Sequence, residues 1–154
     1  RNPNDATTHS NTSSVAADLS VSSLKAAITN FEDTLDHRGL NMRLVPKTLL
    51  VTTADRFTAE EILQSQLEPY VAENTKNVLA SEGLMVKVNN YLTDADNYFI
   101  LADKSDHELK FIWRTPLVFK RDSDFDSWDA KFGAFMRFSV GVVGWRGTYG
   151  VQGA

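Results

Sequence analysis

The chain has 154 residues, of which 42% are hydrophobic and 23% are charged, so it has the size and composition of one globular domain with a buried core. It contains no cysteine, which excludes disulfides, thiolate nucleophiles and cysteine-ligated zinc or iron–sulfur sites. A formal net charge of −4 argues against a protein whose main role is to neutralise nucleic-acid phosphates or to lie on anionic lipid.

The first 18 residues are polar and predict a flexible arm or linker. They are rich in Asn, Thr, Ser and Asp, so burying them cannot offset the entropy of ordering them. No apolar run reaches the roughly 20 residues that span a bilayer, and the N-terminus lacks the pattern of a signal peptide. We therefore expect a soluble protein that does not associate with membranes. Because the sequence starts at Arg1, we expect a processed or partial chain.

An amphipathic helix is predicted over residues 20–37. Apolar residues recur at spacings of three and four and line one face: Leu24, Ile28, Phe31 and Leu35. Ser20 is the predicted N-cap. At the other end, His37 and Arg38 followed by Gly39 supply cationic groups and a residue that tolerates the left-handed conformation.

A second helix is predicted over residues 59–67. Thr58 and Glu61 have the spacing of a capping box, and Phe57 and Ile62 occupy the two positions of a hydrophobic staple. These signals place the start of the helix at Ala59.

Three short strands and one loop are predicted around this helix. The β-branched run at 48–53 predicts a buried strand, and residues 84–88 and 98–101 predict two more. The polar segment 65–83 predicts a loop that contains about one helical turn.

The C-terminal part predicts longer strands. Leu109, Phe111 and Trp113 alternate with Lys110 and Arg114, which predicts a strand. The polar segment 103–108 before them predicts a hairpin turn. Period-two alternation then continues from Trp128 to Val142, which corresponds to roughly 50 Å of strand. A strand of this length suits an extended molecule better than a compact one.

One acidic segment is a weak candidate for a calcium loop. Asp122, Asp124 and Asp126 have the alternate spacing of calcium ligands. The required glycine is replaced by Ser127 and the bidentate glutamate by Gly133, so a solvated turn is the favoured interpretation.

No catalytic, metal or cofactor residue is predicted. The histidines at 9, 37 and 107 are scattered and have no metal-ligand spacing. The nucleophile-elbow, P-loop and dinucleotide-binding glycine motifs are all missing, so the chain is not expected to be an enzyme.

Two aromatic–arginine pairs are the candidate interaction residues. Trp113 precedes Arg114 and Trp145 precedes Arg146, a combination that is enriched at interface hot spots. A protein–protein interface is the favoured role, and packing within the domain and stacking on nucleic acid are the alternatives.

Three collinear segments resemble the tailed-phage major capsid proteins of the HK97 fold. The first is the helix followed by PKTLLV at 46–51. The second is YLTD at 91–94 followed by YFILAD at 98–103. The third is the segment 132–154, which contains GWRGTYG.

The resemblance implies an α+β, HK97-like fold. Residues 1–18 would be an arm, 19–47 the spine-like helix of the P-domain and its connection, and 48–115 mainly the A-domain. Residues 116–154 would be strands that return to the P-domain. The family's N-terminal arm and E-loop would lie before Arg1.

The resemblance also implies a non-enzymatic shell subunit that forms hexamers and pentamers around packaged DNA, which it contacts only nonspecifically. It would assemble in the host cytoplasm into the virion capsid, with scaffolding, portal or decoration proteins as further partners. The residues expected at its subunit interfaces are Trp113, Arg114, Trp145, Arg146 and Tyr149. The alternatives are an interaction module of another phage structural protein and a small hydrolase with its site near His37 or His107.

Overall fold

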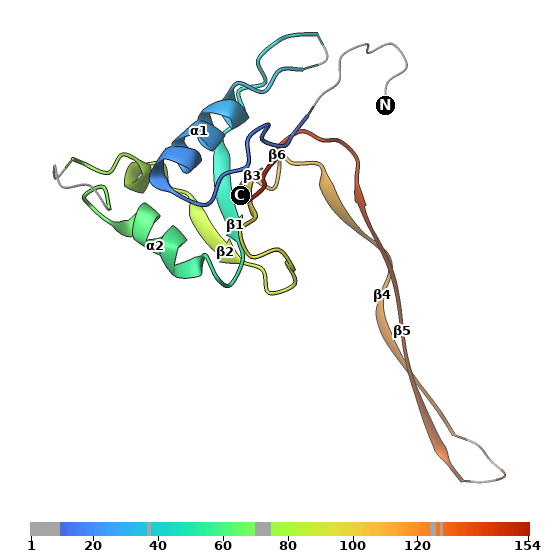
Figure 1. Ribbon diagram of the computed structural model, residues 1–154. Helices are drawn as coiled ribbons and strands as arrows, with labels where there is room; N and C mark the ends of the chain where they lie inside the picture. Colours follow the sequence, from blue (N-terminus) through green and yellow to red (C-terminus); the bar gives the residue numbers. More distant parts are fainter. Residues whose placement is uncertain (1–9, 37, 70–74, 124–125, 127) are drawn as a thin grey trace. The chain divides into compact units, whose positions relative to one another are not determined.

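The computed structural model shows a mixed α+β fold, as predicted, with two helices and two sheets (Figure 1). The residues that it describes are 10–36, 38–69, 75–123, 126 and 128–154. The chain divides into two compact units. Unit 1 spans Arg1–His107 and Trp145–Ala154, and unit 2 spans Glu108–Gly144.

Unit 1 is built on a four-stranded sheet in the order β2-β1-β3-β6. Its strands are β1 (Pro46–Val51), β2 (Met85–Val88), β3 (Tyr98–Ala102) and β6 (Thr148–Val151). The β1–β2 pair is parallel, and the β1–β3 and β3–β6 pairs are antiparallel. The first three strands confirm the sequence prediction, whereas β6 was not predicted.

One face of this sheet forms the core of unit 1. The strand registers place two rows of side chains across it: Val86, Leu49, Ile100 and Tyr149 in one row, and Val88, Val51, Tyr98 and Val151 in the next. Tyr98 is fully buried, as are Leu49 and Ile100. The buried residues of both helices join the same cluster, so the helices cover this one face of the sheet.

Helix α1 (Val21–Glu32) begins as predicted and ends earlier than predicted. Ser20 is its N-cap and forms a capping box with Ser23. The helix stops at Glu32 because the chain turns back after it, where Leu35 pairs with Asn41 in an antiparallel bridge. The side chain of Leu35 is 49% exposed and so does not extend the buried face of the helix.

The predicted end of α1 lies partly outside the described residues. His37 is not described, and Gly39 has φ +76°, so it takes the left-handed conformation that its sequence context indicated. It does so within the 35–41 turn rather than at the end of the helix, and its N–H donates to the carbonyl of Asp36 at 2.8 Å.

The capping box and staple predicted for the second helix are wrong. Helix α2 (Arg56–Gln64) has Asp55 as its N-cap and begins three residues before the predicted start. Thr58 therefore lies inside the first turn, where it cannot act as the cap. Phe57 is 68% exposed, and the buried residues of the helix are Ala59, Ile62 and Leu63.

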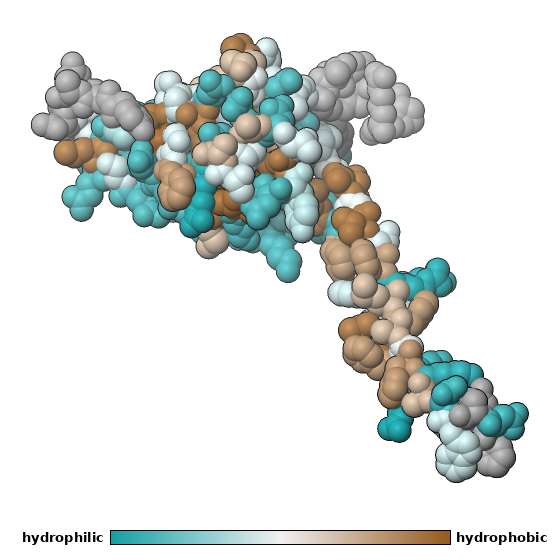
Figure 2. Space-filling model, turned by 60° about the horizontal axis from the view of Figure 1, so that its bottom comes forward, coloured by the Kyte–Doolittle hydropathy of each residue, from teal (hydrophilic) through white to brown (hydrophobic). Residues whose placement is uncertain are grey.

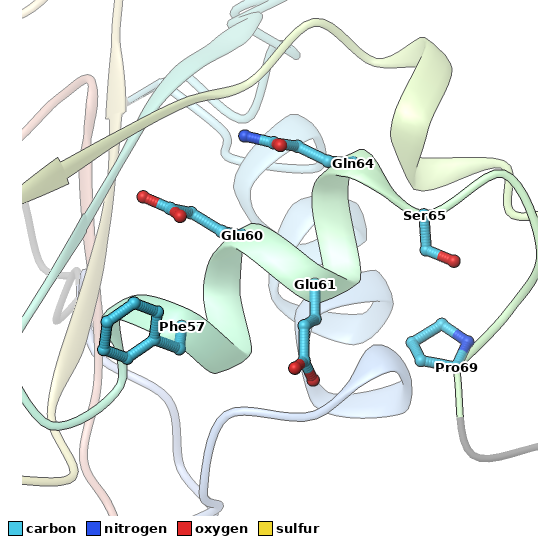
Figure 3. A pocket seen from close by; sticks show the side chains of 6 residues that line it. All are labelled: Phe57, Glu60, Glu61, Gln64, Ser65 and Pro69. Carbon is cyan, nitrogen blue, oxygen red and sulfur yellow. The ribbon is translucent and has the colours of Figure 1, made fainter.

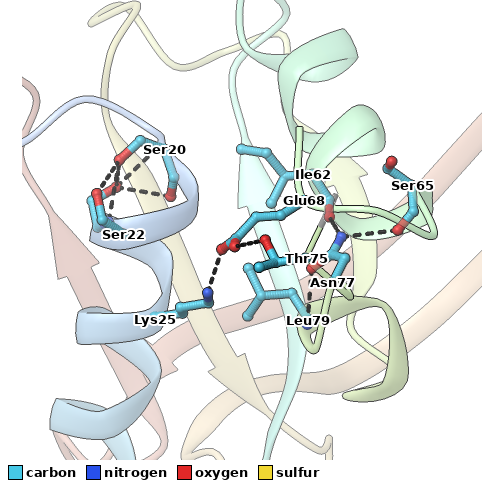
Figure 4. Close-up of polar contacts among 10 residues, drawn as sticks. Ser20, Ser22, Lys25, Ile62, Ser65, Glu68, Thr75, Asn77 and Leu79 are labelled. Atoms are coloured by element: carbon cyan, nitrogen blue, oxygen red, sulfur yellow. Dashed lines mark hydrogen bonds and ion pairs between the residues drawn. The ribbon is translucent and has the colours of Figure 1, made fainter. Parts of the chain in front are cut away.

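A buried asparagine fixes the segment that follows α2. The Asn77 side chain is 2% exposed, and its amide donates to the carbonyls of Ile62 and Ser65 (Figure 4). Its Oδ1 accepts from the N–H of Leu79 at 3.0 Å, which positions the 3₁₀ turn η1 (Leu79–Ser81). This turn agrees with the single helical turn predicted within 65–83.

An ion pair ties α1 to the same segment. The Lys25 ammonium donates to the carboxylate of Glu68, which also accepts from the Thr75 hydroxyl at 3.0 Å (Figure 4). These two hydrogen bonds lower the pKa of Glu68.

Part of the predicted N-terminal arm lies along the sheet of unit 1. Thr12 forms a parallel bridge with Gly150, whose N–H donates to the Asn11 carbonyl at 2.8 Å. Further along, Ala17 donates to the carbonyl of Gln152 at 2.9 Å. Residues 11–17 therefore follow the outer edge of β6, because a strand edge offers unpaired backbone groups that a polar segment can bind through its own backbone.

Unit 2 is a long antiparallel hairpin of β4 (Leu109–Ser123) and β5 (Ala130–Val142). Strand β5 confirms the long strand that the period-two alternation from Trp128 to Val142 predicted. The 103–108 segment is not the turn of a hairpin, because β3 pairs with β1 and β6 while β4 pairs with β5. It is instead the connection by which the chain leaves unit 1.

Candidate functional site

The β4–β5 hairpin has two chemically different faces. Strand β5 alternates without interruption, so its even-numbered residues share one face and its odd-numbered residues share the other. We call the first the apolar face; it consists of Leu109, Phe111, Trp113, Phe119, Arg121, Ser123, Ala130, Phe132, Ala134, Met136, Phe138, Val140 and Val142. We call the second the basic face; it consists of Lys110, Ile112, Thr115, Val118, Lys120, Asp122, Lys131, Gly133, Phe135, Arg137, Ser139 and Gly141.

The apolar face is exposed along its length. The large hydrophobic side chains of β4 and β5 are all exposed to solvent, and none of them belongs to a buried core. These side chains give the hairpin its brown colour in Figure 2. Three rings gather near its middle. The ring of Phe111 stacks on that of Phe138 at 5.1 Å, and the ring of Trp113 meets both edge-on at 5.0 and 5.8 Å.

These rings remain half-exposed even in contact with one another. Phe111 is 53% exposed, Trp113 52% and Phe138 50%. An isolated two-stranded hairpin is at best marginally stable in water, and its rings gain most of their hydrophobic stabilisation only when a second layer covers them. The hairpin therefore has the composition of an interface rather than of a free surface.

Two irregularities bend β4 without disturbing β5. The register shifts once between Trp113 and Thr115 and again between Thr115 and Val118, each time with one extra residue in β4. Pro116 lies in the second irregularity, where its missing N–H breaks no regular ladder bond. Arg114 lies in the first, and its side chain is exposed. The continuity of β5 keeps both faces intact past the bulges.

The candidate interface residues from the sequence separate between the units. Trp113 and Arg114 belong to the exposed hairpin, whereas Trp145 and Arg146 belong to unit 1 and are half-buried. Tyr149 is 8% exposed and packs in the core row of β6, so little of its side chain is available to a neighbour.

Arg146 has a partner within its own chain. Its guanidinium forms an ion pair with the carboxylate of Asp36 and lies 5.9 Å from the ring centroid of Trp145. Gly147, which follows, has φ +73°, and a Cβ there would come within 2.9 Å of the His107 backbone. The segment 145–147 is thus a tight turn held inside unit 1, a contact that spacing alone could not predict.

The outer side of α2 is a second surface feature. Phe57, Glu60, Glu61 and Gln64 line a shallow pocket of about 560 Å³ with Ser65 and Pro69 (Figure 3). The Arg56 guanidinium lies 5.6 Å from the Phe57 ring centroid and pairs with Glu60 at 3.3 Å. This surface combines one exposed ring with two carboxylates.

The N-cap of α2 has an unusual charge environment. Burial raises the pKa of the Asp55 carboxyl, and repulsion from Asp96 and Asp18 raises it further. The carboxyl thus binds its proton more tightly in the folded than in the unfolded chain. The free energy of unfolding therefore decreases as the pH rises from about 3.9, the usual pKa of aspartate, through the higher pKa of Asp55 in the folded chain.

We expect Asp55→Asn to raise the melting temperature at neutral pH relative to the native chain. The Asp55 side chain makes no capping hydrogen bond that the substitution could lose, and asparagine carries no charge to desolvate. The gain should shrink below about pH 4, where Asp55 is protonated in both states. Thermal unfolding of both proteins across pH 3 to 8 measures the difference in melting temperature. A difference that does not change with pH would show that the pKa of Asp55 is not raised in the folded chain.

The candidate calcium loop is only partly described. Asp122 lies in β4 beside Lys131, and Asp124 lies outside the described residues. Within the part of the chain that is described, no group of three His, Asp or Glu side chains is placed to hold a metal ion. Over the same residues, neither helix is long and apolar enough to cross a bilayer.

The comparisons with known proteins agree on one class. A solved phage-related protein from Bordetella bronchiseptica RB50 has a similar fold, with a TM-score of 0.51 and 10% identity over 86% of this chain. The chain spans 48% of the length of that protein. The search of curated protein sequences found no match to the present chain. The model of a family described as phage capsid protein matches residues 2–151. Since that match covers nearly all of the sequence, the chain belongs to this family of phage capsid proteins.

Proposed function

We propose that this chain is part of a major capsid protein of the HK97 fold and serves as a non-enzymatic subunit of an icosahedral shell. It joins other copies in hexamers and pentamers around packaged DNA, which it contacts only nonspecifically. Assembly takes place in the host cytoplasm. Scaffolding, portal and decoration proteins contact the same shell. Helix α1 corresponds to the spine-like helix in this proposal.

The apolar face of the hairpin is the observation that carries the proposal. Its large hydrophobic side chains, from Leu109 and Val142 at one end to Phe119 and Phe132 near the other, are all at least 40% exposed in the single chain. A monomer gains nothing from a row of exposed rings, which lowers its solubility. A subunit that is covered by its neighbours gains hydrophobic free energy from the same row. Trp113 on this face and Arg114 in the adjacent bulge are the proposed contact residues, because rings and arginines dominate interface energetics.

Electron microscopy of the full-length protein tests this function. We expect closed shells of uniform diameter, with five- and six-fold capsomers, that form as the protein concentration rises. Analytical ultracentrifugation of the same samples should show large closed particles in equilibrium with subunits or capsomers. A protein that stays monomeric at high concentration, in the presence of the other head proteins, would contradict the proposal.

A further inference from the structure

We propose, on the basis of the shell function above, that the basic face of the hairpin binds the outer side of α2 in a second copy of this chain. The apolar face and the basic face would then serve two different contacts. The observations that carry this inference are two glycines, the cations opposite them and the composition of the α2 surface.

The glycines of β5 lie on the basic face. Glycine weakens the interior of a strand, and strands retain it at bulges, at bends or where another backbone approaches closely. Neither Gly133 nor Gly141 has a left-handed φ, and both irregularities of the hairpin lie between Trp113 and Val118 of the other strand. A Cβ placed on either glycine meets no atom within 4 Å. In this proposal, close approach by a second copy explains both glycines.

Each glycine lies opposite a lysine. Gly133 pairs with Lys120 and Gly141 with Lys110 in the strand register. The pair Val118–Phe135 lies between them, next to Arg137. The basic face therefore offers bare backbone and a small apolar centre, with positive charge on both sides.

Charge is distributed unevenly along the chain. Unit 2 contains six Lys and Arg residues and five Asp and Glu residues, and all six cations but only one of the carboxylates lie in β4 and β5; unit 1 contains ten Lys and Arg residues and fifteen Asp and Glu residues. A cationic ribbon and an acidic body from different copies attract each other, and such complementarity guides encounter and fixes the register of docking.

The outer side of α2 complements the basic face. Phe57 is 68% exposed and can pack on the Val118–Phe135 pair, while Glu60 and Glu61 can meet the cations beside it. One turn separates Phe57 from Glu61 on the helix, a rise of about 6 Å. Phe135 and Gly133 are two positions apart on the strand, a rise of about 6.6 Å, and Lys120 lies opposite Gly133. The two spacings allow ring and charge to be matched at once.

A protein partner fits this face better than the phosphates of a nucleic acid. The Val118–Phe135 pair of the basic face is apolar, and a phosphate backbone would leave it uncovered. The exposed ring of Phe57 can cover this pair while a carboxylate of α2 meets the cation beside it.

A charge exchange between the two surfaces tests the proposal in full-length protein. We expect Lys120→Glu and Glu61→Lys each to raise the concentration needed for shell assembly about tenfold, and the double variant, which restores opposite charges, to recover most of that loss. Circular dichroism of each subunit verifies that it is folded. A double variant whose defect equals the two single defects combined would overturn the proposal.

Gly133→Val provides an independent measurement. Valine favours strand conformation and has open space in the single chain, so the melting temperature of the subunit should stay the same or rise. Assembly should fall at least about tenfold, because the side chain would block the approach of α2. Gly133→Ala should have an intermediate effect.

The outcomes distinguish this contact from the shell function. Normal shell yield from Gly133→Val and from Lys120→Glu would overturn the α2 contact and leave the shell function standing. If the Lys120→Glu shells formed normally but held less DNA, the basic face would belong to DNA, which also overturns the proposal. Failure of the native protein itself to form shells would remove the shell function and this contact together.

Discussion

Replacing Trp113 and Phe138 together by serine is expected to abolish shell assembly while unit 1 remains folded. Both rings belong to the three-ring cluster of the apolar face, and each is about half exposed in the single chain. Aromatic anchors of this kind contribute about 2 kcal/mol or more each when an interface buries them. Each loss corresponds to at least about a thirtyfold rise in the concentration required for association. Particle yield by sedimentation and electron microscopy measures the effect.

Tyr91→Ser is the matched control for this experiment. Tyr91 is an aromatic residue of unit 1 and is 93% exposed, so its removal deletes a ring of similar size outside the hairpin. We expect its shells to form at the native concentration. Native assembly by the double serine variant would show that the apolar face is not a contact surface.

Replacing Tyr98 by alanine is expected to lower the free energy of unfolding of unit 1 by about 3–5 kcal/mol. The ring is fully buried at the start of β3 and shares its row with Val51 and Val151. Its removal leaves a cavity that a sheet held between neighbouring strands cannot close. Since domains have a total stability of about 5–15 kcal/mol, a substantial fraction of the chain would unfold.

Urea unfolding followed by circular dichroism measures this loss. Tyr98→Phe keeps the ring and should retain most of the stability. Tyr91→Ala removes an exposed tyrosine and should change the free energy of unfolding by no more than about 0.5 kcal/mol. Equal destabilisation by Tyr98→Ala and Tyr91→Ala would show that Tyr98 is not a core residue.

The local patterns of the sequence predicted the regular elements well. The alternation from Trp128 to Val142 corresponds to β5, and the apolar run around Leu49 corresponds to β1. Both follow from period-two burial or from a run of β-branched residues, which need only neighbouring residues to be recognised. Ser20 was also found, because a cap forms within one helical turn.

Competition between local signals explains the errors. Thr58 and Glu61 have the spacing of a capping box, but Asp55 occupies the cap, so that Ala59, Ile62 and Leu63 share the buried face. Tertiary packing thus outweighed a capping motif that contributes about 1 kcal/mol. Strand β4 continues beyond Arg114 because bulges accommodate Pro116, and no alternation marks that part of the strand.

Contacts between residues far apart in the sequence decided which of the predicted interface residues stay exposed. Trp113 was predicted to contact a partner because it precedes Arg114, a combination that is enriched at interface hot spots, and the structure leaves its side chain half-exposed. Arg146 has the same sequence context beside a tryptophan. Its partner Asp36 lies more than a hundred positions earlier in the chain, so spacing could not indicate that this guanidinium is paired within unit 1.

The place of the hairpin in the chain determines the order in which the protein can fold. Strands β3 and β6 are neighbours in the sheet, yet the whole of β4 and β5 is synthesised between Ala102 and Thr148. During synthesis on the ribosome, the aromatic rings of the hairpin are therefore exposed to solvent before β6 can pair with β3 and place Val151 beside Tyr98 in the core of unit 1. Nascent chains on one messenger RNA can thus meet through their hairpins while their cores are still open. Chaperones that cover the hairpin during synthesis would delay such contacts until the sheet has closed.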